Sequence, residues 1–211
     1  MLKKLCIAFI GIVLTTWPAY AVPGEKAIAQ IKGTVEDSTV SGMVNFEETS
    51  EGVNVDAKIV GAPGGKHGFH IHDKGDCAEK GAAAGGHYNP ENVQHGLVMK
   101  DGMMHAHVGD LGNIEIMANS AGSVTAFIPG LSITGGKYNI DGRSVILHEK
   151  EDDFGQPTGN AGSRIGCGVI ISSGATEAHG VDAKDEMISE KKTSMDSMHM
   201  DANMPSMNAS Y

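Results

Sequence analysis

The residues best able to do chemistry in this sequence are its histidines. Ten occur among 211 residues, and seven of them lie between His67 and His107. His70 and His72 are two residues apart in a segment whose alternating pattern predicts a β-strand, so both side chains project from the same face. Imidazole is the commonest metal ligand in proteins, and two imidazoles on one face can bind one ion. This pair therefore predicts part of a metal site.

Other side chains could complete that site and build a second one. His87, His95 and His107 lie in a long polar segment, and Asp110 follows His107 by three residues, close enough to bind the same ion. Histidine nitrogens with one carboxylate oxygen form a four-ligand set that zinc accepts in tetrahedral geometry. His148 ends a later predicted strand and could join a site made of imidazoles alone, which suits copper.

The elements that must position these residues are short strands. From Ala27 onward, apolar alternation broken by glycine and turn residues predicts an all-β domain. Eight such segments predict an eight-stranded Greek-key β-sandwich or flattened barrel. The predicted strands are 27–35, 40–47, 52–60, 66–72, 112–118, 122–129, 143–149 and 165–172.

Two segments, 73–111 and 150–164, are too long for hairpin turns and are rich in Gly, Asp, His and Asn. Structureless segments of this length in a compact domain are usually functional or disordered. Because histidines and aspartates lie at their edges, we expect both to be functional loops.

The first 21 residues have the pattern of a cleavable signal peptide. Lys3 and Lys4 precede an apolar run, and the segment ends in Ala19-Tyr20-Ala21, a small-residue cleavage site. Cys6 lacks the preceding small residue of a lipoprotein, so no membrane anchor is expected. A short signal of this type predicts an exported protein of the bacterial periplasm, with residues 22–173 as its only domain.

Charge and cysteine content narrow the possible partners. The formal charge of −10 becomes −12 when Lys3 and Lys4 are removed, which argues against binding to nucleic acid or anionic membranes. Cys77 and Cys167 remain after cleavage, and two cysteines in an exported protein usually pair. A metal site containing both is the alternative.

Five motifs together resemble the copper/zinc superoxide dismutases of the exported bacterial type, over about residues 27–172. The resemblance implies an oxidoreductase that converts superoxide to dioxygen and hydrogen peroxide, protects against extracytoplasmic superoxide, and sometimes forms homodimers. In order, the motifs are Gly68-Phe69-His70-Ile71-His72, Gly86-His87-Tyr88-Asn89-Pro90, His107-Val108-Gly109-Asp110-Leu111-Gly112-Asn113, His148-Glu149-Lys150-Glu151-Asp152-Asp153 and Gly159-Asn160-Ala161-Gly162-Ser163-Arg164.

The resemblance also implies roles for individual residues. His87 would bridge both metals and exchange a proton during the redox cycle, and Arg164 would meet the anionic substrate. Asp152 would link a copper histidine to a zinc histidine from behind the metals, and Cys77 would form a disulfide with Cys167. The implied copper ligands are His70, His72, His87 and His148, and the implied zinc ligands are His87, His95, His107 and Asp110.

Two other histidines need a separate interpretation. Residues 96–106 do not align with the family, so His105 competes with His107 for the zinc position. The adjacent Val108-Gly109-Asp110 favours His107. His67 shares its strand face with Phe69 and Ile71 and is interpreted as structural.

The segment 174–211 lacks the apolar periodicity of a packed element and is predicted to be disordered. Six of the twelve methionines lie between Met187 and Tyr211, and thioethers favour Cu(I). One hypothesis is transient copper capture. The alternatives are a solvated tail or one that absorbs oxidant as methionine sulfoxide. The candidate ligands are Met195, Met198, His199, Met200, Met204 and Met207.

A copper store that keeps the fold without turnover is the competing function. Such a relative would be expected to lose ligands or the active-site arginine. All seven ligand positions and Arg164 are present here, which favours the enzyme.

Overall fold

A computed structural model of the chain describes residues 24–174. The predicted signal peptide and the predicted copper-capturing tail lie outside these residues. Each of the eight predicted strands is present, and most bounds shift by one or two residues. The strands are β1 (Lys26–Gly33), β2 (Ser41–Glu48), β3 (Gly52–Val60), β4 (Gly65–His72), β5 (Asp110–Ile116), β6 (Ala121–Pro129), β7 (Ser144–His148) and β8 (Arg164–Ser172).

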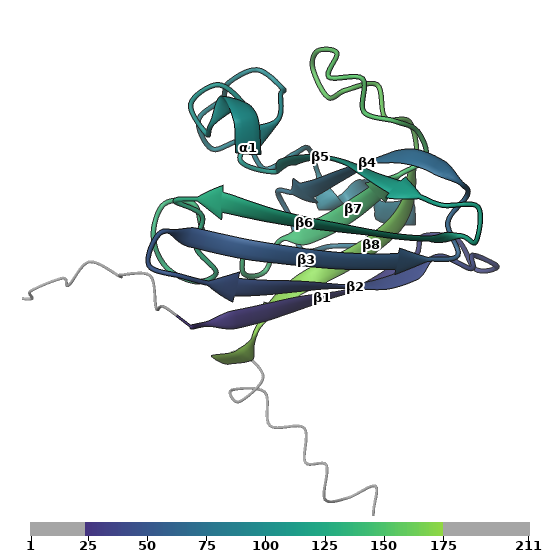
Figure 1. The fold of residues 1–211 in the computed structure, drawn as a ribbon, viewed down its shortest axis with the longest axis horizontal. Helices are drawn as coiled ribbons and strands as arrows, with labels where there is room; N and C mark the ends of the chain where they lie inside the picture. Colours follow the sequence, from purple (N-terminus) through teal and green to yellow (C-terminus); the bar gives the residue numbers. More distant parts are fainter. Residues whose placement is uncertain (1–23, 175–211) are drawn as a thin grey trace, which may run out of the picture. The chain divides into compact units, whose positions relative to one another are not determined.

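The strands form one closed antiparallel barrel in the order β1-β2-β3-β6-β5-β4-β7-β8, and β8 closes on β1. The connection from β3 to β4 passes over two strands, as does the connection from β6 to β7, which is Greek-key topology. Figure 1 shows β1, β2, β3 and β6 side by side on one side of the barrel. The predicted all-β fold is confirmed.

Alternation along each strand fills the interior of the barrel. In β1, Ala27, Ala29 and Ile31 are buried, whereas Ile28 and Gln30 between them point outward and are exposed. Each fully buried aliphatic side chain of the size of Ile31 contributes about 1.5–3 kcal/mol relative to exposure. Within residues 24–174, no helix is long and apolar enough to cross a membrane.

Strand β4 is buried on both faces over its last six residues. Phe69 and Ile71 point into the hydrophobic core, so His70 and His72 project from the outer face of the barrel. The two long connections cover that outer face and make it as buried as the core. The histidines therefore lie between the barrel wall and the loops.

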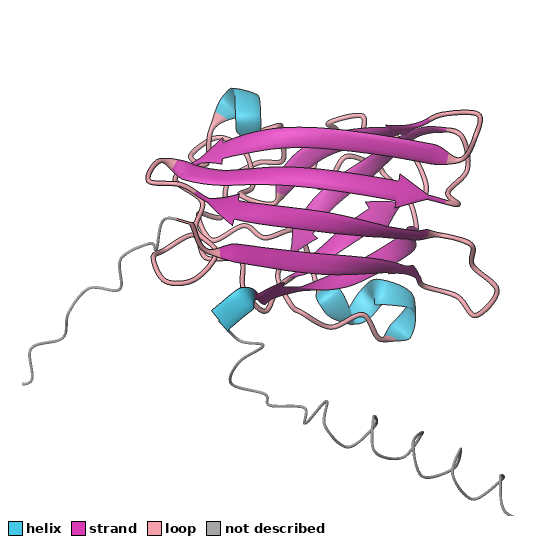
Figure 2. Cartoon of the chain, turned by 60° about the horizontal axis from the view of Figure 1, so that its bottom comes forward, coloured by secondary structure: helices cyan, strands magenta, loops and turns pink. Residues whose placement is uncertain are grey.

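The first long connection is more ordered than the sequence suggested. It contains a short 3-10 segment, η1 (Glu79–Ala84), and one helical turn, α1 (Val98–Asp101). It also ends earlier than predicted, because Asp110 and Leu111 belong to β5. Figure 2 shows that these helical segments are small beside the strands that form the body of the molecule.

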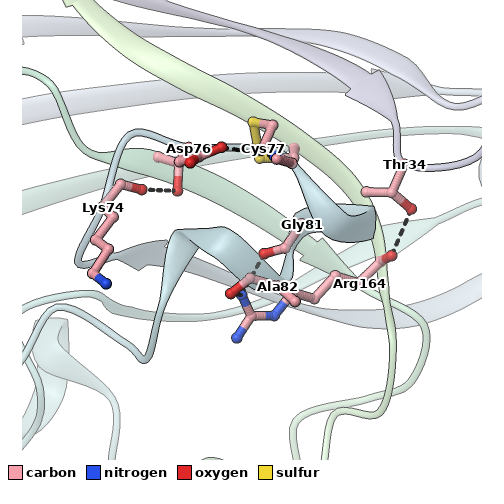
Figure 3. The surroundings of a disulfide bond; sticks show 10 residues. Thr34, Lys74, Asp76, Cys77, Gly81, Ala82 and Arg164 are labelled. Atoms are coloured by element: carbon pink, nitrogen blue, oxygen red, sulfur yellow. Dashed lines mark hydrogen bonds between the residues drawn. A yellow bond between two sulfur atoms is a disulfide. The ribbon is translucent and has the colours of Figure 1, made fainter.

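A disulfide between Cys77 and Cys167 ties this connection to β8, as predicted. Its cysteines are 90 residues apart, and closing a loop of that length stabilises a protein by about 4–5 kcal/mol in the chain-entropy model. Because both sulfurs are bonded to each other, the alternative of a metal site containing them is excluded. Figure 3 shows the disulfide close to η1 and Arg164.

Candidate metal centre

Four histidines converge on the outer face of the barrel to form what we call the imidazole group. Each offers one ring nitrogen, and these atoms all lie within 4.8 Å of one another. Nε2 of His72 lies 3.3 Å from Nε2 of His148. No member is more than 7% exposed, so the rings are shielded from bulk solvent. The members are His70, His72, His87 and His148.

Strand pairing brings three of these rings together. Phe69 of β4 pairs with Leu147 of β7, and both belong to the core. The next residue of each strand, His70 on β4 and His148 on β7, therefore lies on the opposite, outer face. Because the strands are antiparallel neighbours, residues about 80 positions apart in sequence lie next to each other.

The fourth ring, that of His87, comes from a loop segment that pairs with the end of β4. His72 and His87 form an isolated antiparallel bridge, and the amide of Tyr88 donates to the carbonyl of Ile71 at 2.9 Å. On the other side, the Gly109 amide donates to the Tyr88 carbonyl at 3.0 Å. A Cβ on Gly109 would lie 2.1 Å from the Ile71 oxygen, so only glycine permits this close approach.

A second set, which we call the carboxylate group, consists of His87, His95, His107 and Asp110. Oδ1 of Asp110 lies 2.8 Å from Nδ1 of His87 and 3.1 Å from Nδ1 of His107. Its Oδ2 lies 2.9 Å from Nδ1 of His95. The backbone amides of Gly96 and His107 also donate to Oδ2. All four residues are buried, and every ring presents the same atom to the carboxylate.

His87 belongs to both groups. Its Nδ1 faces Asp110, which leaves Nε2 as the ring nitrogen available to the imidazole group. Its ring centroid lies 4.1 Å from that of His70 on one side and 5.2 Å from that of His95 on the other. One imidazole therefore lies between the two groups and offers a nitrogen to each.

Asp152 connects the two groups from behind. Its Oδ2 lies 2.9 Å from Nε2 of His70, and its Oδ1 lies 2.9 Å from Nε2 of His95. The side chain of Asn113 binds both the amide and the carbonyl of Asp152, at 2.8 and 2.9 Å. Such hydrogen bonds fix the orientation of a metal-binding ring and leave its other nitrogen for the ion. His70, His95 and Asp152 form a third convergent set that these bonds explain without an ion.

The rings of the imidazole group have lowered pKa values, which keep their nitrogen lone pairs free to bind a metal cation. Burial lowers the pKa of His72 to about 2, that of His148 to about 3 and that of His87 to about 4. Burial also lowers the pKa of His70. These rings are neutral at physiological pH, which is the protonation state that a metal requires.

The carboxylate group has the opposite character. Burial lowers the pKa of His95, but the close approach of the Asp110 and Asp152 carboxylates outweighs this and raises it to about 9. Burial raises the pKa of Asp110, but the hydrogen bonds from His107 and His87 and the nearby ring of His95 hold it well below its ordinary value. The carboxylate is therefore charged, and the group favours a proton or a metal cation between the rings.

The donor atoms fit a metal in each group. Nδ1 of His70 is buried and has no hydrogen-bond partner, although its Nε2 is bonded to Asp152. Nδ1 of His95 lies 2.9 Å from an Asp110 oxygen without hydrogen-bond geometry. A neutral His95 that donates from Nε2 to Asp152 turns a lone pair toward that oxygen. A cation bound to both atoms removes this repulsion.

Arg164 begins β8 and lies near the imidazole group. Its guanidinium donates to the carbonyls of Gly81 and Gly85, which belong to the connection tethered by the disulfide. Its charge contributes to lowering the pKa of both His72 and His148, which places it within electrostatic reach of them. The guanidinium is therefore a fixed cation, partly buried beside the rings.

The other two histidines of the cluster lie outside both groups. The ring nitrogens of His67 lie 2.8 Å from the His148 carbonyl and 2.9 Å from the Pro63 carbonyl, which agrees with a structural role. His105 is exposed and belongs to neither group, whereas His107 belongs to the carboxylate group.

Sequence reasoning missed three residues that support the site: Asn113, Gln156 and Gly159. A Cβ on Gly159 would lie 1.8 Å from Oδ1 of Asp152 and 2.7 Å from Nε2 of His95. Asn113 and Gly159 lie within motifs that the sequence singled out, but neither is a ligand type. For Gln156 the sequence carries no signal.

Taken together, the fold and the site define a Greek-key barrel protein with two adjacent histidine-rich metal sites that share one imidazole. Comparison with known proteins agrees. The family model for copper/zinc superoxide dismutase (SODC) matches residues 40–170. The chain belongs to the copper/zinc superoxide dismutase family, whose members are oxidoreductases that use copper and zinc.

Several individual proteins are similar over most of the domain. The extracellular superoxide dismutase [Cu-Zn] of Drosophila melanogaster is 46% identical over 159 residues, 69% of this chain and 84% of that protein. That of Caenorhabditis elegans is 42% identical over 136 residues, 61% of this chain and 60% of that protein. The crystal structure of the clock protein EA4 matches at a TM-score of 0.62 and 36% identity, covering 74% of this chain and 98% of that one.

Proposed function

We propose that this protein is a superoxide dismutase with copper in the imidazole group and zinc in the carboxylate group. The overall reaction consumes two superoxide anions and two protons and yields dioxygen and hydrogen peroxide. A nitrogen-only set suits copper, whereas three imidazoles with one carboxylate suit tetrahedral zinc. The copper ligands are His70, His72, His87 and His148, and the zinc ligands are His87, His95, His107 and Asp110.

The observation that carries this proposal is the shared ring of His87. Nδ1 of this ring faces Asp110, with which it would share the zinc ion, and the bridge to His72 holds its backbone. The ring thus keeps its place whatever happens at Nε2. That nitrogen can hold a proton and deliver it to a reduced oxygen species nearby.

Copper, when bound, supplies the one-electron chemistry that oxidises one superoxide and reduces the next. The remaining work belongs to the side chains. Asp152 fixes the rings of His70 and His95 through their Nε2 atoms, so that Nδ1 of His70 faces the ion. The two long loops exclude water from the rings, which are at most 7% exposed.

Arg164 attracts and orients the anionic substrate. Its planar group has five N–H donors, and the carbonyls of Gly81 and Gly85 anchor it. Because the protein carries a formal charge of −10, attraction of an anion must be local. A fixed guanidinium beside the rings provides that attraction.

The decisive experiment measures superoxide decay by the purified, metal-loaded protein beside its His148→Ala variant. We expect rapid decay with the parent and little acceleration with the variant. Stoichiometric metal without accelerated decay in the parent would leave the competing function, a copper store.

The proposal places this activity outside the cytoplasm. Similar proteins from Drosophila melanogaster, Caenorhabditis elegans and Haemonchus contortus are described as extracellular. The signal pattern of residues 1–21 and the disulfide both suit export. We place the mature protein in a bacterial periplasm, without a membrane anchor. Fractionation of cells expressing the full chain, with and without residues 1–21, tests this location.

For the tail after Ser173, we propose transient capture of Cu(I) by its methionines and His199. The spacing in Met195-Asp196-Ser197-Met198-His199-Met200 supports this, because soft thioethers and imidazole lie within six residues. Truncation after Ser173 should slow copper loading when copper is scarce. Unchanged loading would contradict capture.

We also propose a homodimer through the outer face of β1 and β8. Ile28 and Ile171 are direct partners across these strands and are 48% and 45% exposed. Paired exposed isoleucines form an apolar surface that a second copy can cover. Light scattering should show a dimer for the parent and a monomer for Ile171→Asp. A monomeric parent would exclude the dimer.

A further inference from the structure

We propose that Gln156 is a positioning residue for the zinc ligand His95. The inference rests on the assignment of zinc to the carboxylate group. Oε1 of Gln156 accepts a hydrogen bond from the His95 amide at 3.0 Å, and its Nε2 donates to the His95 carbonyl at 2.9 Å. The two residues are 61 positions apart. One side chain therefore holds both backbone groups of one ligand.

This pair of bonds fixes the main chain from which the ring projects. A side-chain amide that binds the N–H and C=O of one residue acts as a neighbouring strand would, and it limits rotation of both flanking peptides. The next amide, that of Gly96, donates to Oδ2 of Asp110 at 2.9 Å. The backbone of His95 is thereby held in a position that sets where its ring can point.

The ring itself has a carboxylate beside each of its nitrogens. Nδ1 lies 2.9 Å from Oδ2 of Asp110, and Nε2 lies 2.9 Å from Oδ1 of Asp152. A ligand whose backbone and ring are already placed loses little conformational freedom when it binds an ion. Release of the backbone lets the ring leave the ion more easily, although the two carboxylates remain.

The turn that presents Gln156 is folded on itself. The Gly159 amide donates to the Gly155 carbonyl, and the Asp153 carboxylate accepts from the Gly155 amide and from Asn160. The ring of Phe154 stacks on that of His95, with 6.3 Å between centroids. One turn, residues 152–160, thus contacts His95 through a carboxylate at its start and an amide in its middle.

Gln156 acts on one metal and not the other. Within residues 24–174 its side-chain hydrogen bonds go to His95, which belongs to the carboxylate group alone. Asp152, by contrast, binds a ring from each group. Loss of the Gln156 amide should therefore weaken zinc retention and leave copper retention unchanged. Because Gln156 is exposed, water competes for its bonds and the effect is moderate.

The test compares zinc release from the fully metal-loaded protein and three variants. Gln156→Met keeps the length of the side chain and removes both bonds, and Gln156→Glu keeps an acceptor and removes the donor. Gln94→Met is the matched control, because Gln94 is an exposed neighbour of His95 whose side chain makes no hydrogen bond within residues 24–174. A chromophoric chelator reports zinc release, and the visible spectrum of cobalt bound in place of zinc reports ligand geometry.

We expect Gln156→Met to release zinc about 3- to 10-fold faster than the parent. This is at or below the usual loss of metal affinity when a residue hydrogen-bonded to a metal ligand is removed. The zinc release rate of Gln156→Glu should fall between those of Gln156→Met and the parent, and Gln94→Met should release zinc at the parental rate. The cobalt spectrum should change in Gln156→Met alone. A parental release rate and spectrum in Gln156→Met would overturn the inference, as would equal acceleration in Gln94→Met. A parent protein that binds no zinc would instead overturn the proposed zinc site.

Discussion

The two metal groups share one ring but are built in different ways. Strands β4 and β7 supply three of the four residues of the imidazole group. The carboxylate group takes His95 and His107 from the long connection, and Asp110 begins β5. Strand pairing places the first group, whereas hydrogen bonds between loops place the second.

The difference in construction corresponds to a difference in charge. Two strand-borne rings, those of His72 and His148, are buried without a carboxylate partner, and burial lowers their pKa values to about 2 and about 3. In the loop-borne group, two carboxylates raise the pKa of His95 to about 9. In the proposed assignment, a neutral set would hold the redox metal, and a set with charged carboxylates would hold zinc.

The largest effect should come from removing the ring that both groups share. His87→Ala removes a proposed ligand from each site, so we expect superoxide dismutation to fall by more than ~100-fold, more than the loss from removing a residue that only orients a ligand. Pulse radiolysis with metal analysis measures both properties. The matched control is His105→Ala, an exposed histidine of the same connection. An equal loss in the control would show that the cluster is not divided as described.

The next largest effect should come from displacing Asp152, which hydrogen-bonds to a ring of each group. Gly159→Ala places a Cβ 1.8 Å from Oδ1 of Asp152, at a φ of +75° that favours glycine. Because Asp152 binds His70 and His95, we expect metal affinity to fall about 10- to 100-fold. Competition with chelators measures it for each metal. Gly64→Ala, whose Cβ would have only ordinary contacts, should behave as the parent. Unchanged affinity in Gly159→Ala would mean that Asp152 does not connect the groups.

A smaller effect is expected from the cation beside the imidazole group. Arg164→Gln should lower kcat/KM for superoxide about tenfold and flatten its dependence on ionic strength, since local charge raises association rates. Lys58→Gln changes the charge equally at an exposed position on β3 and should match the parent. If both variants lose rate equally, net charge and not Arg164 attracts the anion.

The smallest effect is on the pH dependence of stability in chelator-treated, metal-free protein, because the two groups should destabilise the fold on opposite sides of pH 6.5. Histidines with a lowered pKa take up protons more readily in the unfolded chain than in the folded protein. The free energy of unfolding should therefore decrease as pH falls below 6.5, and for His87 this decrease continues down to about pH 4, its folded pKa. The raised pKa of His95 stabilises the folded state fully below pH 6.5, and this contribution is lost as pH rises through about 9. Urea unfolding followed by circular dichroism should therefore show maximal stability near pH 6.5. Zinc should abolish the alkaline decline, and a decline unaffected by zinc would contradict the role given to His95.

The parts of the site that sequence predicts are those with a local pattern. The spacing of His70 and His72 places both on one strand face, and Asp110 follows His107 by one turn, with the amide of His107 donating to its carboxylate. Gln156 could not be predicted, because its partner lies 61 residues earlier and the contact exists only once both loops have folded. The same holds for Gly159, whose missing Cβ makes room for Asp152.

The amino-acid sequence by itself determined the eight strands and the types of ligand, because alternation and residue chemistry are properties of short segments. It also contained the motifs that indicate the family. The family resemblance implied that His87 lies between the groups and that Asp152 joins them, but only the tertiary structure decided the contacts by which they do so. Those contacts depend on barrel closure and on a loop that pairs with the end of β4, which bring distant residues within bonding distance.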